Sequence, residues 1–213
     1  MSTIQLRQDG WVAEEVLRSD CALLELAATY GRPIPSKDGH LICKLRPVPP
    51  TCAAPKTFAS IHGTKAYPLH TDTAFWPTPA RYIILSATGD LRRSTTLCRW
   101  ETLLHTFSTA ELRCLESSIW TVAVTRQPFL CTIRFRLNDD VGYRFDPVAM
   151  NPINRAAHEA SVILNHHLSN VKPMAFDWAD HAVLVLDNWR VLHGRGEAPE
   201  GEGERVISRI YIE

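Results

Sequence analysis

The chain has 213 residues, of which 45% are hydrophobic and 22% are charged, as in a folded globular protein. These values exclude a disordered chain, a collagen-like fibre and a long coiled coil, and the length fits one domain. Lysine and arginine total 23, as do aspartate and glutamate, so the net charge is zero and a nucleic acid is disfavoured as the main partner.

The cysteines and the apolar runs indicate in which cellular compartment the protein is expected. The six cysteines form no C-x-x-C pair, and we interpret them as reduced thiols. The N-terminal segment lacks the apolar stretch of a signal peptide. The longest apolar run, residues 182–186, is far shorter than the ~20 residues of a membrane span. We expect a cytoplasmic protein that does not enter a membrane.

The N-terminal third predicts helices and then an irregular connection. The apolar positions within residues 12–17 fit one helical face, and Ser19 or Asp20 is suited to cap a second helix. Gly31 is expected to end that helix. Residues 45–57 are rich in proline, which favours an irregular segment.

From residue 81 onward the sequence is typical of strands. β-Branched and aromatic residues predict strands at 82–85, 94–98, 119–124, 130–137, 141–145, 182–186 and 205–212. Helices are expected at about 109–118 and 154–169. Many short strands without βαβ alternation favour a β-sandwich with added helices.

A first candidate for chemistry is the motif His70-Thr71-Asp72. On an extended segment, residues two apart point to the same side, so the imidazole and the carboxylate can bind one ion. The motif is short and needs a second signal elsewhere in the chain.

The C-terminal segment supplies that second signal. A buried apolar strand leads into Asp187-Asn188 and then to His193, and Arg205 and Arg209 follow four residues apart on one face of the last strand. Two histidines and one carboxylate occupy one face of an octahedral ion and leave three positions open. Such a set can hold ferrous iron while a bidentate co-substrate and dioxygen bind.

These segments resemble one enzyme family. The stretches 68-PLHTDTAFWPTPARYIIL-85, 186-LDNWRVLHGR-195 and 205-RVISR-209 are similar to the taurine dioxygenase/clavaminate synthase-like branch of the Fe(II)/2-oxoglutarate-dependent oxygenases. The resemblance implies a mainly β fold with flanking helices, a double-stranded β-helix (jelly roll). It implies one domain over residues 1–213, with a helical segment at about 1–35 and a jelly-roll core at about 40–213.

The resemblance also implies the cofactor site. His70, Asp72 and His193 match the iron ligands, and no catalytic side chain is implied beyond this metal centre. The cofactors are then Fe(II) with 2-oxoglutarate and O2 as co-substrates. Decarboxylation of 2-oxoglutarate to succinate and CO2 accompanies hydroxylation of an unactivated C–H bond. Because related halogenases lack the carboxylate ligand, the presence of Asp72 favours oxygenation over halogenation.

Further residues follow from the same resemblance. Arg205 matches the arginine that binds the distal carboxylate of 2-oxoglutarate, and Thr96 matches a threonine that assists it, or Thr95 if the alignment shifts by one residue. Arg209 matches a position that binds an anionic group of the substrate in several relatives.

The substrate is the open part of this prediction. Phe75 and Trp76 follow the H-x-D motif and either line the substrate pocket or pack in the core. We expect a small-molecule or carrier-bound substrate, amino-acid-like or an intermediate of secondary metabolism. The chain is shorter than most relatives, so the substrate-covering insert is minimal, or a homo-oligomer, partner subunit or carrier completes the pocket.

Two alternatives remain. A zinc-dependent hydrolase with His70, Asp72 and His193 as ligands would need a general base and would leave the two arginines unexplained. A catalytically inactive partner subunit of an oxygenase would keep the fold, bind metal loosely and show no turnover of 2-oxoglutarate.

Overall fold

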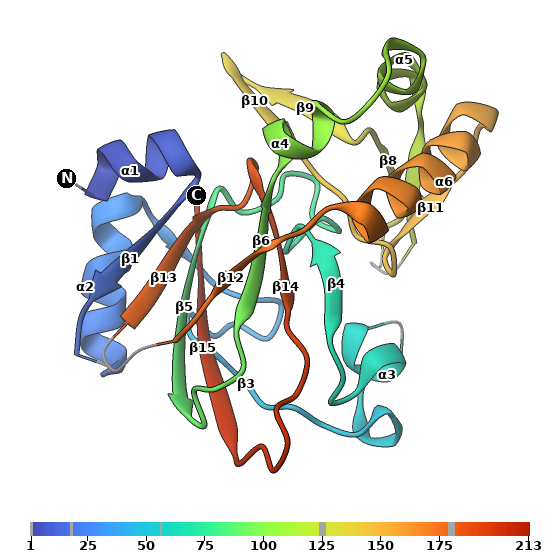
Figure 1. Cartoon of the computed structure of the whole chain (residues 1–213). Helices are drawn as coiled ribbons and strands as arrows, with labels where there is room; N and C mark the ends of the chain where they lie inside the picture. Colours follow the sequence, from blue (N-terminus) through green and yellow to red (C-terminus); the bar gives the residue numbers. More distant parts are fainter. Residues whose placement is uncertain (1, 18, 56, 124–126, 179–181) are drawn as a thin grey trace.

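Two facing β-sheets form the centre of the molecule in a computed structural model (Figure 1), which describes residues 2–17, 19–55, 57–123, 127–178 and 182–213. The larger sheet has the order β1 (Trp11–Glu15), β13 (Ala182–Asp187), β5 (Tyr82–Gly89), β15 (Arg205–Ile212) and β2 (Pro33–Ile34), and β3 (Cys43–Leu45) also pairs with β15. The smaller sheet has the order β12 (Met174–Phe176), β6 (Thr95–Arg99), β14 (Val191–Arg195) and β4 (Tyr67–His70). The strand pairs within both sheets are antiparallel.

The remaining elements lie outside these two sheets. Five further strands form a hairpin and a three-stranded sheet: β9 (Arg134–Leu137), β10 (Asp140–Tyr143), β7 (Trp120–Val122), β8 (Phe129–Cys131) and β11 (Met150–Pro152). The helices are α1 (Ser2–Asp9), α2 (Asp20–Tyr30), a 3-10 turn at Pro50–Cys52, α3 (Phe58–His62), α4 (Trp100–Leu104), α5 (Thr109–Ser117) and α6 (Arg155–Asn170). None of the helices in the described part of the chain is long and apolar enough to cross a membrane.

The alternation of side chains along the strands creates separate apolar layers. On β15, Ile207 and Tyr211 face the space between the two sheets, where they pack with Leu85 and Leu97. The intervening Ile210 faces the opposite side, which α1 and α2 cover (Figure 1). A sheet buried on both faces reads as a continuous apolar run, as β13 does.

A third apolar layer supports the smaller sheet from outside. Leu69 and Leu192 pack there with Trp100, Trp120 and Leu164, so α4 to α6 and the three-stranded sheet brace the strands that carry the candidate site. This arrangement confirms the predicted mainly β fold with flanking helices.

The prediction of a helix over residues 12–17 is wrong. The segment forms β1, which pairs with β13 from Trp11 opposite Leu186 to Glu15 opposite Ala182. Pairing at the open edge of a buried sheet outweighs a weak local helical pattern in so short a segment.

The other predicted elements are found with small changes. The second helix is α2, whose cap is Ser19: its side chain accepts a hydrogen bond from the Ala22 amide. Residues 130–137 divide into β8 and β9, and the strand predicted for 119–124 is β7, with residue 124 outside the described residues.

Candidate metal centre and anion pocket

The three predicted ligands come together between the two sheets. His70 is the last residue of β4, Asp72 follows it in the connecting loop, and His193 lies on β14 directly opposite His70. Each offers a ligand atom within 4.8 Å of those of the other two, and the residues are only 6–8% exposed. The antiparallel pairing of β4 and β14 therefore builds the group from two distant parts of the sequence.

A hydrogen bond to the backbone orients the ring of His70. His70 Nδ1 lies 2.9 Å from the Pro68 carbonyl oxygen, so Nδ1 carries the proton and Nε2 is left with a free lone pair. Burial, together with the charge of His193, lowers the pKa of His70 to about 3. The imidazole is therefore neutral at physiological pH, the form that binds a metal.

Asp72 is held through its backbone by Asn188. The Asn188 side-chain oxygen accepts a hydrogen bond from the Asp72 amide at 3.0 Å, and its Nδ2 donates to the Asp72 and Ala80 carbonyls, both at 2.9 Å. Asn188 is fully buried at the turn between β13 and β14. The turn that precedes His193 thus also holds the backbone of Asp72, from which the carboxylate extends.

The Asp72 side chain is paired with Arg209 of β15. Arg209 Nη1 lies 3.0 and 2.8 Å from the two carboxylate oxygens. Burial acts to raise the pKa of Asp72, but the Arg209 guanidinium and the two neighbouring histidines outweigh it and hold this pKa well below its usual range. Asp72 is therefore ionised at physiological pH.

The donor set fits a divalent transition metal. His193 Nε2 lies 3.7 Å from Asp72 Oδ2, longer than a hydrogen bond but suited to two ligands of one ion, each about 2 Å from it. Two imidazoles and one carboxylate on one side of the site leave other coordination positions open, as a facial triad does.

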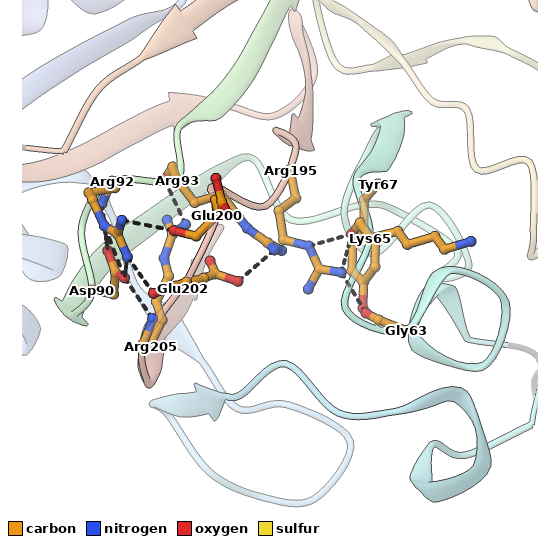
Figure 2. Close-up of polar contacts among 12 residues, drawn as sticks. Gly63, Lys65, Tyr67, Asp90, Arg92, Arg93, Arg195, Glu200, Glu202 and Arg205 are labelled. Atoms are coloured by element: carbon orange, nitrogen blue, oxygen red, sulfur yellow. Dashed lines mark hydrogen bonds and ion pairs between the residues drawn. The ribbon is translucent and has the colours of Figure 1, made fainter.

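Arg205 lies on the same face of β15 as Arg209, four residues nearer the start of the strand. It is 5% exposed, its Nη1 donates to the Arg93 carbonyl oxygen at 2.6 Å, and its guanidinium lies 5.7 Å from the Trp178 ring. Figure 2 shows the carboxylate of Glu202 paired with Arg93, Arg205 beside them, and Arg195 turned toward Lys65 and Gly63. The space between the two sheets therefore has a carboxylate and two imidazoles at one level and a group of arginines at another.

The register of β6 distinguishes the two candidate threonines. Thr96 pairs with Gly194 and lies on the face opposite to His193; a Cβ at Gly194 would come within 2.7 Å of the Thr96 hydroxyl. Thr95 pairs with Arg195 on the His193 face, and its hydroxyl accepts a hydrogen bond from Trp178 Nε1 at 3.2 Å. Strand geometry thus moves the expected threonine from Thr96 to Thr95.

The two aromatic residues after the H-x-D motif separate. Trp76 lies 5.2 Å from the Tyr211 ring, which in turn lies 4.9 Å from the Arg209 guanidinium. Phe75 packs on the apolar layer outside the smaller sheet. Of the two, Trp76 is on the side of the candidate site.

Three residues that the sequence analysis did not single out belong to this region. Arg93 and Glu202 lie beside Arg205, and Asp146 is a buried carboxylate next to Phe145, whose backbone bonds Thr71 of the H-x-D motif. No motif could have found them, because loops distant in sequence bring them to the site.

No family model matches the sequence, and a search of curated proteins gives no relative. Solved structures do match. An asparagine oxygenase in complex with Fe(II), 2S,3S-3-hydroxyasparagine and succinate superposes with a TM-score of 0.76 and 18% identity, over 98% of this chain and 77% of the other.

Two further structures show the same likeness. PvcB from Pseudomonas aeruginosa matches with a TM-score of 0.71 and 18% identity, over 99% of this chain and 78% of the other. The non-heme iron oxygenase OrfP, as a variant bound to (3S)-hydroxy-L-Arg, matches with a TM-score of 0.71 and 20% identity, over 99% and 77% of the chains.

These matches define the class of fold. The chain has the fold of the Fe/2-oxoglutarate oxygenases over nearly its whole length, and the fold expected from the resemblance is confirmed.

Proposed function

We propose that the protein is an Fe(II)/2-oxoglutarate-dependent oxygenase that hydroxylates an amino acid or an amino-acid derivative. The observation that carries this proposal is the position of the buried His70, Asp72 and His193 group within the same inter-sheet space as the buried Arg205. The net reaction is R–H + O2 + 2-oxoglutarate → R–OH + succinate + CO2. Bound ferrous iron would supply the dioxygen chemistry.

The residues of the chain hold and orient the reactants in this proposal. His70, Asp72 and His193 bind the metal, with the His70 ring set by the Pro68 carbonyl and the Asp72 backbone set by Asn188. Arg205 binds the distal carboxylate of 2-oxoglutarate, for which a buried guanidinium is well suited. Thr95, on the face of the smaller sheet that carries His193, assists Arg205 in this proposal.

The substrate class rests on charge near the metal centre and on the structural relatives. Arg209, once Asp72 binds a metal, can turn part of its guanidinium to an anionic group such as an α-carboxylate, and Trp76 and Tyr211 line the same side. The relatives include structures with hydroxyasparagine and hydroxyarginine. Both observations favour an amino-acid-like substrate.

A zinc hydrolase is the weaker alternative because it assigns no role to Arg205 or Arg93. An inactive partner subunit is disfavoured because all three ligand positions keep metal-binding side chains.

Succinate formation tests the proposal. The protein, loaded with Fe(II), is incubated in air with 2-oxoglutarate and a panel of L-amino acids and dipeptides, and products are followed by mass spectrometry. We expect succinate together with a substrate gain of one oxygen atom. The Asp72→Ala variant should give neither. Succinate at equal rates from both proteins, or none from the wild type with any substrate, would contradict the proposal.

A further inference from the structure

Arg93 is a fully buried arginine next to Arg205. It lies in the connection between β5 and β6, and its side chain has no exposed surface. Its own backbone carbonyl accepts the hydrogen bond from Arg205 Nη1, so the two residues are fixed relative to each other (Figure 2). Arg93 and Arg205 thus form one buried group.

The two guanidiniums hold donors that nothing in the described chain uses. Arg93 Nε and Nη1 and Arg205 Nε are buried and have no hydrogen-bond partner among the described residues. Buried charged donors without partners destabilise a folded protein, so such a group is expected to serve a ligand. Planar N–H donors fit a carboxylate in particular.

The charges around Arg93 and Arg205 also point to an anionic ligand. Arg93 is paired with the Glu202 carboxylate, and Arg205 and Arg195 lie close enough to add positive charge there, while the nearby Asp90 is paired with Arg92. The Arg195 guanidinium already donates hydrogen bonds to the Gly63 and Lys65 carbonyls, so it is not counted as a binding group for a ligand. Burial and the positive charge of Arg93 lower the pKa of Arg205 to about 10. A bound carboxylate would offset this repulsion.

Glu202 occupies the place of such a carboxylate. Its Oε2 lies 2.6 Å from Arg93 Nη2, while its Oε1 is buried without a partner among the described residues. Hydrogen bonds from Arg92 and to Asp90 hold the backbone on either side of Glu202. Arg92 donates to the Glu200 and Gly201 carbonyls at 3.2 and 2.8 Å, and the Gly203 amide donates to Asp90 at 2.7 Å. Because the backbone is held in this way, the Glu202 carboxylate leaves Arg93 by rotation of its side chain rather than by movement of the loop.

The geometry points to Arg93 as a second binding residue for the distal carboxylate of 2-oxoglutarate, and to Glu202 as an internal carboxylate that this group displaces from Arg93. The inference rests on the proposed function and extends it, since neither residue is needed for metal binding. In this inference, the Glu202 carboxylate and the distal carboxylate of 2-oxoglutarate compete for Arg93, and this competition sets the affinity for 2-oxoglutarate.

Calorimetric titration of the anaerobic Fe(II)-loaded protein tests this competition. The ligands are 2-oxoglutarate and 2-oxopentanoate, which keeps the five-carbon chain and the 2-oxo acid group but lacks the second carboxylate. Arg93→Gln should weaken binding of 2-oxoglutarate about tenfold or more, the effect of losing a charge-assisted hydrogen bond. Glu202→Gln should tighten it about threefold to tenfold, because a competing charge is removed.

Controls separate binding from folding. Glu200→Gln, an exposed change in the same loop, should leave both affinities unchanged. The affinity for 2-oxopentanoate should be the same in wild type and Glu202→Gln. Because Arg93→Gln could simply misfold, the gain in affinity of Glu202→Gln is the decisive result, which misfolding cannot imitate.

The outcomes are distinct. A wild type that binds 2-oxoglutarate while Glu202→Gln binds it equally or more weakly overturns the role of Arg93 and Glu202 and leaves the proposed function standing. Equal tightening toward 2-oxopentanoate also overturns it. A wild type that binds neither acid overturns the proposed function and this inference together.

Discussion

Arg209 Nη1 lies within hydrogen-bond distance of both carboxylate oxygens of Asp72, at 3.0 and 2.8 Å. The last strand of the larger sheet is thereby tied to the loop after β4, which belongs to the smaller sheet. A metal ion bound to Asp72 would take over part of the role of the guanidinium, because both neutralise the same carboxylate.

Arg209→Gln is expected to destabilise the metal-free protein more than the metal-loaded protein. Removing one partner of a buried ion pair leaves an unpaired charge and costs about 3–5 kcal/mol. A divalent ion on Asp72 supplies the missing positive charge. Urea unfolding of both proteins with and without added Zn²⁺ measures this, and an equal loss in both conditions would contradict the account.

Asn188→Ala should weaken metal binding about 10- to 100-fold, as the loss of groups that orient ligands commonly does. The variant loses the three hydrogen bonds that hold the Asp72 and Ala80 backbone. Competition with a chelating dye measures the metal affinity. Asn165→Ala, an exposed change on α6, is the control and should bind metal like the wild type. Undiminished affinity in Asn188→Ala would show that Asp72 is positioned by other contacts.

Gly194→Ala tests the close approach of β4 and β14. A Cβ at this position would lie 2.6 Å from the Tyr67 carbonyl oxygen and 2.7 Å from the Thr96 hydroxyl, so the strands must separate. Because His193 precedes Gly194 and faces His70, we expect a loss of about 1–3 kcal/mol in stability and much weaker metal binding. Gly203→Ala, whose Cβ would meet atoms no nearer than 3.5 Å, should be tolerated. Equal behaviour of the two variants would argue against this reading.

Asp146→Asn should stabilise the protein more at alkaline than at acidic pH. Asp146 is 6% exposed and accepts hydrogen bonds from the Val148 and Ala149 amides, contacts that an asparagine oxygen can keep. Burial raises the pKa of Asp146 from 3.8 to about 6. The folded state therefore holds this proton more tightly than the unfolded state, and stability is lost as the pH rises from about 4 to 6.

The size and the measurement follow from that shift. At pH 8 the variant should exceed the wild type by up to about 3 kcal/mol, and the difference should shrink as the pH falls to about 5. Urea unfolding of the metal-free proteins at both pH values measures it. A variant that is less stable at pH 8, or whose advantage does not change with pH, would refute the prediction.

The strands and the metal group could be predicted from the sequence because each has a local signal. The β-branched runs that become β5 and β13 are buried on both faces, and the H-x-D motif and His193 each carry a recognisable neighbourhood. What could not be predicted depends on contacts between distant segments. The strand β1 forms only because β13 offers it an edge.

The group of Arg93, Glu202 and Arg205 also depends on contacts between distant segments. Arg205 could be proposed because the resemblance to the oxygenase family implies it, whereas Arg93 and Glu202 come from two separate loops and carry no motif. The choice between Thr95 and Thr96 required the strand register, because a shift of one residue reverses the face of a side chain.

The central claim is that one site binds iron and 2-oxoglutarate together, and an anaerobic titration tests it most directly. The metal-free protein receives Fe(II) and then 2-oxoglutarate while visible absorbance is followed, with Arg205→Ala as the control. We predict a weak charge-transfer band that requires both additions and develops only at higher 2-oxoglutarate concentration in the variant. The absence of a band in the wild type, with zinc bound in preference to iron, would contradict the account.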